Sequence, residues 1–424
     1  MKAAFINQPW DIVQPPVRRA SVPIWTYEVS TRLARSMEVT VYSKRHADQP
    51  PTQHHEGVRY RRVHSTLDAF SMKYLDRLWK GCRFRRPLFS RMTYHLGYIV
   101  QVARHCRDEN YDVIHLHNLS QFLPVLRHYC PDSKLVLHMH CEWLNQLDRR
   151  LIGPRLEYAN AIVGCSEYIA RQAADAFPSH ADKCHGIHGG VDISRYAPRE
   201  KTRSPQPRIL FVGRISPEKG LHVLLEAFWE ALRAVPELHL DIVGPNSQIP
   251  LEFLGSATPR VRSLAAYYFR NADYYQFLRQ CIPPQRSHQI TFHDHLPHDE
   301  LGTLYQRATV VVMPSVWDEP FGLCLAEAMA SGLPVVASRC GGIGEVVQHK
   351  QTGLLVEPND PQSLAQALLT LLTSPSTCES MGHAGRLRAE QLFSWSAISQ
   401  NLTRLYDQMA ERRTSALPSA GGKD

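Results

Sequence analysis

The 424-residue sequence lacks the patterns that mark several classes of protein. It has no run of about 18 apolar residues that could span a bilayer. The opening MKAAFINQPW is too short and too quickly polar for the apolar core of a secretory signal. It also lacks a Gly-x-Gly-x-x-Gly after a strand, which a nucleotide-dependent oxidoreductase would need. We therefore expect a cytoplasmic protein without that redox chemistry.

The ten cysteines are scattered and form no Cys-x-x-Cys pair, which argues against a disulfide framework and a structural zinc site. Charge is unevenly spread as well. Residues 1–200 hold 28 Lys and Arg against 19 Asp and Glu, a net +9, whereas the remaining residues hold 20 against 21, a net −1. An acidic partner would therefore be attracted to the first half of the chain.

The sequence does contain a regular alternation of short apolar runs with longer amphipathic stretches. After the polar, Pro-rich segment 197–208 this alternation restarts. It predicts an α/β fold with two Rossmann-like, parallel-sheet lobes, and a ligand beyond the carboxyl ends of the strands, in a central cleft. The runs are AAFIN (3–7), EVTVYS (38–43), DVIHLH (112–117), KLVLHMH (134–140) and AIVGCS (161–166), then RILFVGR, LHLDIVG, QITFHDH, VVVMPS, PVVASR and GLLVEP.

The length exceeds what one hydrophobic core usually organises, so two domains are expected. We predict an N-terminal lobe over 1–195 and a C-terminal lobe over 207–390. A final helix over 391–412 should return to the first lobe, and 413–424 should be a disordered tail. Residues 245–288 form a long excursion between two strands, in which we expect an extra helix or two.

The segment FVGRISPEKG (211–220) joins a predicted strand to a predicted helix. Gly213 permits a tight turn there, and Arg214 and Lys219 project nearby. Backbone donors, a helix N-terminus and two cations suit one anionic group of a ligand. Taken alone, the segment is more often a loop whose charges are solvated.

The segment SVWDEPFGLCLAEAMASG (315–332) has helical spacing of its apolar residues. Pro320 suits the first helical turn and Gly332 suits the C-cap, so we predict a helix that starts near Phe321. Its free N–H groups would point at the cleft, and Gly322 would allow a ligand to approach them closely.

Two glutamates of this segment, Glu319 and Glu327, lie eight positions apart. At about 1.5 Å rise per residue their carboxylates would be separated by roughly 9 to 12 Å, which suits a sugar and a ribose joined by a pyrophosphate. Alternatively, Glu319 complements the helix dipole and Glu327 lies on a polar face. A glycosidase is not favoured, because its two carboxylates must face each other across the glycosidic bond.

With its surroundings, the segment EPFGLCLAE resembles the Glu-x7-Glu motif of the retaining GT-B glycosyltransferases of family 4. FVGRISPEKG is similar to that family's phosphate-binding turn, and ITFHDHLPHDEL (290–301) to the strand and loop before the motif. The stretch PVVASRCGGIGEVVQHKQTGLLVEPND (334–360), with Glu345 in its Gly-Gly-x-x-Glu piece, is similar to the segment after it. The resemblance covers nearly the whole chain and implies a GT-B architecture.

The resemblance also implies roles for residues of the second lobe. Arg214 and Lys219 would bind the donor pyrophosphate, and Glu327 would hold the ribose hydroxyls. Glu319 would hold the transferred sugar beside the reacting face, as a catalytic residue. Glu345 is a further candidate. The implied donor-binding set is Gly213, Arg214, Lys219, Pro320, Phe321, Gly322, Leu323 and Glu327.

In the first lobe, the resemblance implies that His140 reaches across the cleft to the donor sugar as a second catalytic residue. His117, which ends DVIHLH, is a weaker candidate. Without the family, a histidine at a strand end is more often a structural hydrogen-bonding residue. The loop 18–28 has no glycine, unlike the Gly-rich turn of the family at this place. Ser21 or Thr26 would replace the contacts that the turn makes to the acceptor.

The absence of any Asp-x-Asp favours a metal-independent reaction, and no cofactor is expected. The implied function is transfer of a hexose-type sugar from a nucleoside-diphosphate sugar to a glycan, lipid-linked or small-molecule acceptor, with retention of configuration. A role in cell envelope polysaccharide synthesis would fit. The alternative is a non-catalytic nucleotide-sugar or glycan binding protein with the same fold. No nucleic-acid partner is expected.

Residues 71–98, SMKYLDRLWKGCRFRRPLFSRMTYHLGY, interleave seven basic side chains with aromatic ones. Such a surface suits anionic lipid or an anionic acceptor. We therefore consider peripheral contact with the inner membrane face. Alternatively, the segment is a solvated helix face whose aromatic residues are buried in the first lobe.

Overall fold

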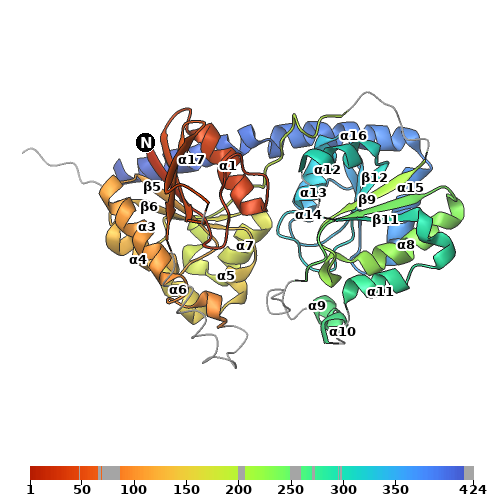
Figure 1. The fold of residues 1–424 in the computed structure, drawn as a ribbon, viewed down its shortest axis with the longest axis horizontal. Coiled ribbons are helices and arrows are strands. Elements are labelled where there is room, and N and C mark those ends of the chain that lie inside the picture. The colour runs from red at the N-terminus through yellow and green to blue at the C-terminus, as the bar shows by residue number, and fades with distance from the viewer. Residues whose placement is uncertain are drawn as a thin grey trace, which may run out of the picture. The chain divides into compact units, whose positions relative to one another are not determined.

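The computed structural model describes residues 1–46, 48–64, 68, 86–198, 206–248, 259–269, 273–294, 296 and 298–414. The chain divides into two compact units, each with its own sheet (Figure 1). Unit 1 comprises Met1–Cys165, Ala170–Ile187 and Trp395–Asp424, and unit 2 comprises Ser166–Ile169 and His188–Ser394. The prediction of two α/β, parallel-sheet lobes is confirmed.

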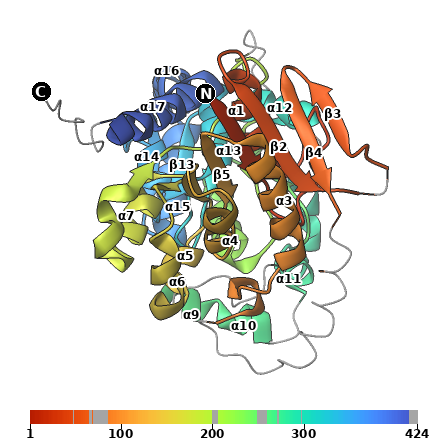
Figure 2. The ribbon, with the colours of Figure 1, turned by 90° about the vertical axis from the view of Figure 1, so that its left-hand side faces the viewer.

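Unit 1 contains an eight-stranded sheet in the order β3-β4-β2-β1-β5-β6-β7-β8. All neighbouring strands are parallel except β3 and β4, which form an antiparallel hairpin at one edge (Figure 2). The five apolar runs of the first half coincide with β1, β2, β5, β6 and β7. The strands are β1 (Lys2–Ile6), β2 (Glu38–Lys44), β3 (Thr52–His55), β4 (Val58–Val63), β5 (Val113–His117), β6 (Lys134–Met139), β7 (Ala161–Gly164) and β8 (Cys184–Gly186).

Two helices far apart in sequence, α1 and α17, pack together with one face of this sheet. In α17 the buried residues Ile398, Leu402, Leu405 and Met409 recur at helical spacing and form one apolar stripe. On the other side, α3 and α4 pack against each other, as Figure 1 also shows. The helices of unit 1 are α1 (Ser21–Leu33), α3 (Leu96–Glu109), α4 (Phe122–Tyr129), α5 (Trp143–Gln146), α6 (Arg149–Leu156), most of α7 (Glu167–Ala176), and α17 (Trp395–Thr414).

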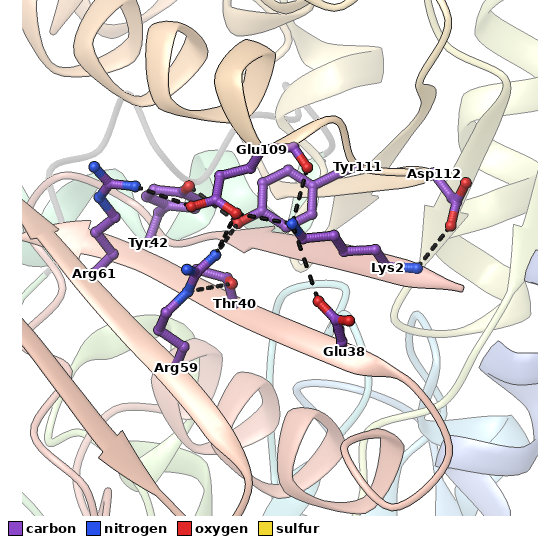
Figure 3. A network of polar contacts seen from close by, with 9 residues as sticks. All are labelled: Lys2, Glu38, Thr40, Tyr42, Arg59, Arg61, Glu109, Tyr111 and Asp112. Carbon is purple, nitrogen blue, oxygen red and sulfur yellow. Dashed lines mark hydrogen bonds and ion pairs between the residues drawn. The ribbon is translucent and has the colours of Figure 1, made fainter.

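A charged network joins α3 to the amino ends of the strands in unit 1. Glu109, at the end of α3, accepts from Lys2 at 2.8 Å and from Arg59 at 2.8 Å, and Arg61 lies 3.4 Å away (Figure 3). Hydrogen bonds from Arg59 and Lys2 lower the pKa of Glu109 to about 2. Cations from β1 and β4 therefore meet one carboxylate at the amino edge, opposite the edge where ligands bind in parallel sheets.

Unit 2 contains a six-stranded, fully parallel sheet in the order β11-β10-β9-β12-β13-β14. All six apolar runs of the second half coincide with these strands. Since strands of such a sheet are buried on both faces, their sequences are nearly continuous in apolar residues. The strands are β9 (Arg208–Val212), β10 (His239–Val243), β11 (Ile290–His293), β12 (Val310–Met313), β13 (Val335–Ser338) and β14 (Gly353–Val356).

The largest apolar cluster of unit 2 joins α8, α15 and the sheet. The excursion 245–288 supplies α9, α10 and α11, and α11 packs into the same cluster beside α8 (Figure 1). The helices of unit 2 are α8 (Leu221–Ala234), α9 (Pro259–Ser263), α10 (Ala265–Phe269), α11 (Tyr274–Gln280), α12 (His298–Arg307), α13 (Leu323–Ala330), α14 (Ile343–Val346), α15 (Pro361–Leu372) and α16 (Pro375–Arg388).

Two expectations concern residues that the structure describes only in part. Residues 71–85 of the basic segment 71–98 lie outside the described residues, as do residues 415–424 of the expected tail. Among the helices that the structure describes, none has the length and apolarity needed to cross a membrane.

Candidate donor-binding and catalytic site

Glu319 lies in the loop between β12 and α13, where it is almost completely buried. Its Oε1 atom accepts hydrogen bonds from Lys219 Nζ at 2.6 Å, Ser315 Oγ at 2.6 Å and Trp317 Nε1 at 2.8 Å. Burial alone would raise the pKa of Glu319, but the Lys219 cation and the three hydrogen bonds outweigh it and lower that pKa. Glu319 is therefore a buried carboxylate held in its charged form.

Lys219 reaches Glu319 because of a tight turn before α8. Gly220 follows with a φ of 72°, in the left-handed region that favours glycine. A Cβ on Gly220 would lie 1.9 Å from the carbonyl oxygen of Pro314 at the end of β12. This close approach of two backbones needs glycine, and it brings two segments a hundred residues apart into one ion pair.

Arg214 does not contact Glu319 in the described structure but pairs with Glu218, which no sequence pattern had singled out. Glu218 is fully buried and accepts from Arg214 Nη2 at 2.9 Å, Ser216 Oγ at 2.7 Å and Tyr268 OH at 3.0 Å. Its position directly before Lys219 in SPEKG was the one available signal. The two predicted cations are thus each balanced by a buried carboxylate.

The helix of the Glu-x7-Glu segment begins later than predicted. α13 starts at Leu323, and Gly322 precedes it with a φ of 99°. The prediction of a start near Phe321, with Pro320 in the first turn, is wrong, because a left-handed residue interrupts the helical conformation. Glu319 is therefore not helical, and the separation estimated from helical rise does not apply to it.

The start of α13 nevertheless offers backbone donors. Among the described residues, none accepts a hydrogen bond from the N–H groups of Phe321, Gly322 or Leu323. The first N–H groups of a helix have no partner within the helix and suit an anion or a hydroxyl. Only Pro320 separates these three donors from Glu319 in the chain.

Glu327 lies inside α13 and is buried as deeply as Glu319. Its Oε1 accepts from Tyr196 OH at 3.2 Å and its Oε2 from Tyr305 OH at 2.8 Å. Burial raises the pKa of Glu327 to about 7, although both tyrosine hydrogen bonds lower it. The tyrosines come from distant segments and were not identified from the sequence.

The carboxylate of Glu345, the further candidate of the second lobe, is hydrogen-bonded to other groups of the protein. Its carboxylate accepts from the backbone N–H groups of Glu167 at 2.7 Å and Tyr168 at 2.5 Å, and from His188 Nε2 at 3.1 Å. It therefore caps the first turn of α7, where a negative charge is stabilised.

The two histidine candidates of unit 1 are hydrogen-bonded to each other. His117 Nδ1 lies 3.0 Å from His140 Nε2, and His117 Nε2 lies 3.0 Å from Thr26 Oγ1. Thr26 is fully buried in α1, so it does not provide the acceptor contacts expected of it. Burial lowers the pKa of both histidines, which keeps them neutral.

A second histidine pair lies beside the first, because His115 and His138 occupy the same face of β5 and β6. Nitrogens of His115, His117 and His138 come within 4.8 Å of one another, a spacing that a metal ion could use after adjustment. However, His115 Nε2 already lies 3.1 Å from His138 Nδ1, and His115 Nδ1 lies 2.8 Å from Tyr406 OH. Hydrogen bonds therefore occupy both nitrogens of His115, while His138 Nε2 is buried with no hydrogen-bond partner among the described residues.

Solved structures resemble the whole chain. Sucrose-phosphate synthase from Thermosynechococcus elongatus superposes with a TM-score of 0.72 at 21% identity, covering 97% of this chain and all of that one. HepE from Anabaena, in complex with UDP, superposes with a TM-score of 0.66 at 20% identity, covering 96% of this chain and 100% of that one. The fold is that of the GT-B glycosyltransferases.

Sequence comparison gives the family. The models described as Glycosyltransferase Family 4 and Glycosyl transferases group 1 match residues 22–195 and 192–388. A D-inositol 3-phosphate glycosyltransferase from Kineococcus radiotolerans is 30% identical over 92% of this chain and 91% of its own length. Spore coat protein SA from Bacillus subtilis is 26% identical over 93% of this chain and 96% of its own length. The chain belongs to these glycosyltransferases.

Proposed function

We propose that this glycosyltransferase moves a hexose-type sugar from a nucleoside-diphosphate sugar to a glycan, lipid-linked or small-molecule acceptor, with retention of configuration and without a metal ion. The bond from the anomeric carbon to the phosphate oxygen breaks, and a bond to an acceptor oxygen forms. The nucleoside diphosphate leaves with the electron pair of the broken bond, and the proton of the acceptor hydroxyl passes to the departing phosphate oxygen.

The observation that carries this proposal is the Lys219–Glu319 ion pair together with the N–H groups at the start of α13, for which the described part of the chain provides no acceptor. Lys219 and Arg214 would neutralise the departing diphosphate, and Glu319 would hold hydroxyls of the transferred sugar. The backbone turn at Gly213 would let the diphosphate approach. Two cations and a helix start supply the charge that a metal would otherwise provide.

Glu327 would hold the ribose hydroxyls by exchanging one of its tyrosine hydrogen bonds for a hydroxyl of the ligand. From unit 1, His140 would bind a hydroxyl of the donor sugar, and His117 would support it. A hexose donor is further supported by structural neighbours of 20% identity, which are complexes of HepE with UDP and glucose and with UDP-glucose.

Calorimetry with UDP, GDP and ADP, followed by the matching sugars, tests the donor part of the proposal. We expect one diphosphate to bind clearly better than the others. A labelled donor then distinguishes transfer or slow hydrolysis from binding without catalysis. Failure of all three diphosphates to bind would contradict the proposal.

Variants of the site separate effects on diphosphate affinity from effects on turnover. Glu327→Ala and Arg214→Ala should each weaken diphosphate binding by at least ~1.5 kcal/mol, the scale of a lost charged hydrogen bond. Glu319→Ala should lower turnover more than it lowers diphosphate affinity, since its proposed partner is the sugar. Arg233→Ala and Glu226→Ala, at exposed positions of α8, are matched controls and should change neither quantity.

We also propose that the protein works in the cytoplasm, in cell envelope polysaccharide synthesis, with peripheral contact to the inner membrane face through residues 71–98. Each basic residue near anionic lipid adds about 1 kcal/mol. Of the basic residues in this segment, Arg86 and Arg91 are described, and Arg86 pairs with Asp148. Co-sedimentation with anionic and neutral vesicles at low and high salt tests this. Binding that ignores lipid charge, salt and an Arg83/Arg85/Arg86→Ser variant would rule it out.

A further inference from the structure

Unit 1 contains a continuous chain of hydrogen bonds that ends at His140. Thr26 Oγ1 lies 3.0 Å from His117 Nε2, and His117 Nδ1 lies 3.0 Å from His140 Nε2. The Trp25 ring packs edge-on against both imidazoles, with centroids 5.5 and 5.9 Å away. His117 is completely buried, whereas His140 keeps partial solvent exposure. No described residue hydrogen-bonds His140 Nδ1.

The protons of this chain can be assigned by counting donors and acceptors. Thr26 Oγ1 lies 3.0 Å from the carbonyl oxygen of Val22 and 3.2 Å from the side-chain amide of Asn7. The oxygens of Val22 and Asn7 can only accept, so the single hydroxyl proton of Thr26 is needed between Thr26 Oγ1 and one of these oxygens. Turning the Asn7 amide by 180° would give its unpartnered Nδ2 a contact with Thr26 and leave this assignment unchanged.

The Thr26 oxygen must then accept from His117, which places the His117 proton on Nε2. A neutral imidazole carries one proton, so His117 Nδ1 is an acceptor and receives the Nε2–H of His140. The lone pair of His140 is therefore at Nδ1, the nitrogen without a described partner. The hydrogen bond of one ring nitrogen sets the role of the other.

We propose that Thr26 and His117 are positioning residues that hold His140 as a hydrogen-bond acceptor at Nδ1, so that the group bound there is a sugar hydroxyl and not a phosphate. This rests on the proposed function, in which His140 meets the donor sugar. A lone pair attracts an O–H and repels phosphate oxygens, whereas a protonated imidazole would do the reverse. Burial of both rings acts in the same direction, because it disfavours the charged form.

The neighbouring pair, His115 and His138, provides an internal control. Its two rings are also hydrogen-bonded to each other, and His115 is hydrogen-bonded to the hydroxyl of Tyr406. However, both of these rings are fully buried, so this pair offers no accessible nitrogen to a ligand. Tyr406→Phe should therefore leave the protonation of His140 and the transfer rate unchanged.

Nitrogen-15 NMR of the histidine rings tests the proposal directly, without any substrate. With His140 assigned by its loss in His140→Asn, we expect Nδ1 to resonate as an unprotonated nitrogen and Nε2 as a protonated one. Thr26→Val removes the acceptor for His117 Nε2–H, so both rings should exchange tautomers. Thr26→Ser should restore the original pattern. A protonated Nδ1 in the native protein, or an unchanged spectrum in Thr26→Val, would overturn the proposal.

Kinetics gives a second measure. Thr26→Val should lower kcat about 10-fold, the worth of one hydrogen bond, with the affinity for the bare nucleoside diphosphate unchanged, and Thr26→Ser should keep the native rate. Thr370→Val, at an exposed helical threonine, controls for the substitution itself. Equal losses in Thr26→Val and Thr26→Ser would refute the positioning role. If the native protein transfers no sugar, the proposed function fails, while the NMR result still decides the tautomer.

Discussion

The surroundings of Glu319 and of Glu327 differ sharply, although both glutamates are buried and belong to one short segment. Glu319 is buried together with a cation, Lys219, at 2.6 Å. Glu327 is buried against the hydroxyls of Tyr196 and Tyr305. Its pKa rises to about 7, whereas the pKa of Glu319 falls. The buried carboxylate of Glu319 stays charged because the Lys219 cation hydrogen-bonds to it, whereas for Glu327 burial outweighs the two tyrosine hydrogen bonds and the attraction of Arg195.

The difference fits two tasks. A permanently charged Glu319 can accept hydrogen bonds from sugar hydroxyls at any physiological pH. In the proposed function, Glu327 would bind ribose hydroxyls best when it is ionised, so its raised pKa would make donor binding depend on pH. Three predictions test this contrast, in order of expected effect.

The largest effect should come from Lys219→Met, which leaves the Glu319 carboxylate buried without its cation. Removing one partner of a buried ion pair costs about 3 to 5 kcal/mol of unfolding free energy. Urea denaturation of the variant and the native protein at pH 7 would measure this loss. The double variant Lys219→Met/Glu319→Gln should recover at least half of this loss, because no charge remains to be buried. Arg233→Met, which removes an exposed cation, should be neutral. A loss below about 0.5 kcal/mol would show that Glu319 is not held charged by Lys219.

The second effect is a pH dependence that Glu327→Gln should remove. The pKa of Glu327 is raised from 4.5 to about 7 in the folded protein. The folded state therefore holds this proton more tightly than the unfolded chain, and stability falls as pH rises from 4.5 to 7. The difference between the two pKa values corresponds to roughly 3 kcal/mol.

Urea denaturation between pH 4 and 8 measures this effect as the difference between native protein and Glu327→Gln. Relative to the variant, the native protein should lose stability steadily across the interval. The comparison with Glu319→Gln should show the opposite sense. The pKa of Glu319 in the native protein is lowered, so its carboxylate stabilises the fold above the unfolded value of 4.5. This stabilisation is lost only at more acidic pH. A constant difference between native protein and Glu327→Gln would contradict the environment assigned to Glu327.

The smallest effect distinguishes the two tyrosines. Tyr305→Phe removes the 2.8 Å hydrogen bond to Glu327, and Tyr196→Phe removes the 3.2 Å one. We expect about 1 to 2 kcal/mol for Tyr305 at pH 8, where Glu327 is ionised, and less for Tyr196. Both losses should shrink at pH 5, because a protonated carboxyl accepts weaker hydrogen bonds. Losses that do not change with pH would mean that the tyrosines act only through packing.

Prediction from the sequence worked best where the signal is local. The buried strands of both parallel sheets are continuous apolar runs, so each was found from its own residues. The edge hairpin β3–β4 was not, because TQHH and VRYRRV are rich in polar residues and form no continuous apolar run. The start of α13 was misplaced because Pro320 is compatible both with a first helical turn and with the loop that precedes Gly322.

For the site, the sequence supplied the residue types and their order: two cations after one strand, two glutamates around a helix start, and histidines at strand ends. Which of them meet depends on contacts between distant segments, such as Lys219 with Glu319 and Tyr305 with Glu327. The same glutamate side chain becomes a charged or a titrating group according to those partners. Burial and partner choice set the pKa, and they arise only when the chain folds, because Lys219 is a hundred residues from Glu319 and Tyr196 and Tyr305 are distant in sequence from Glu327.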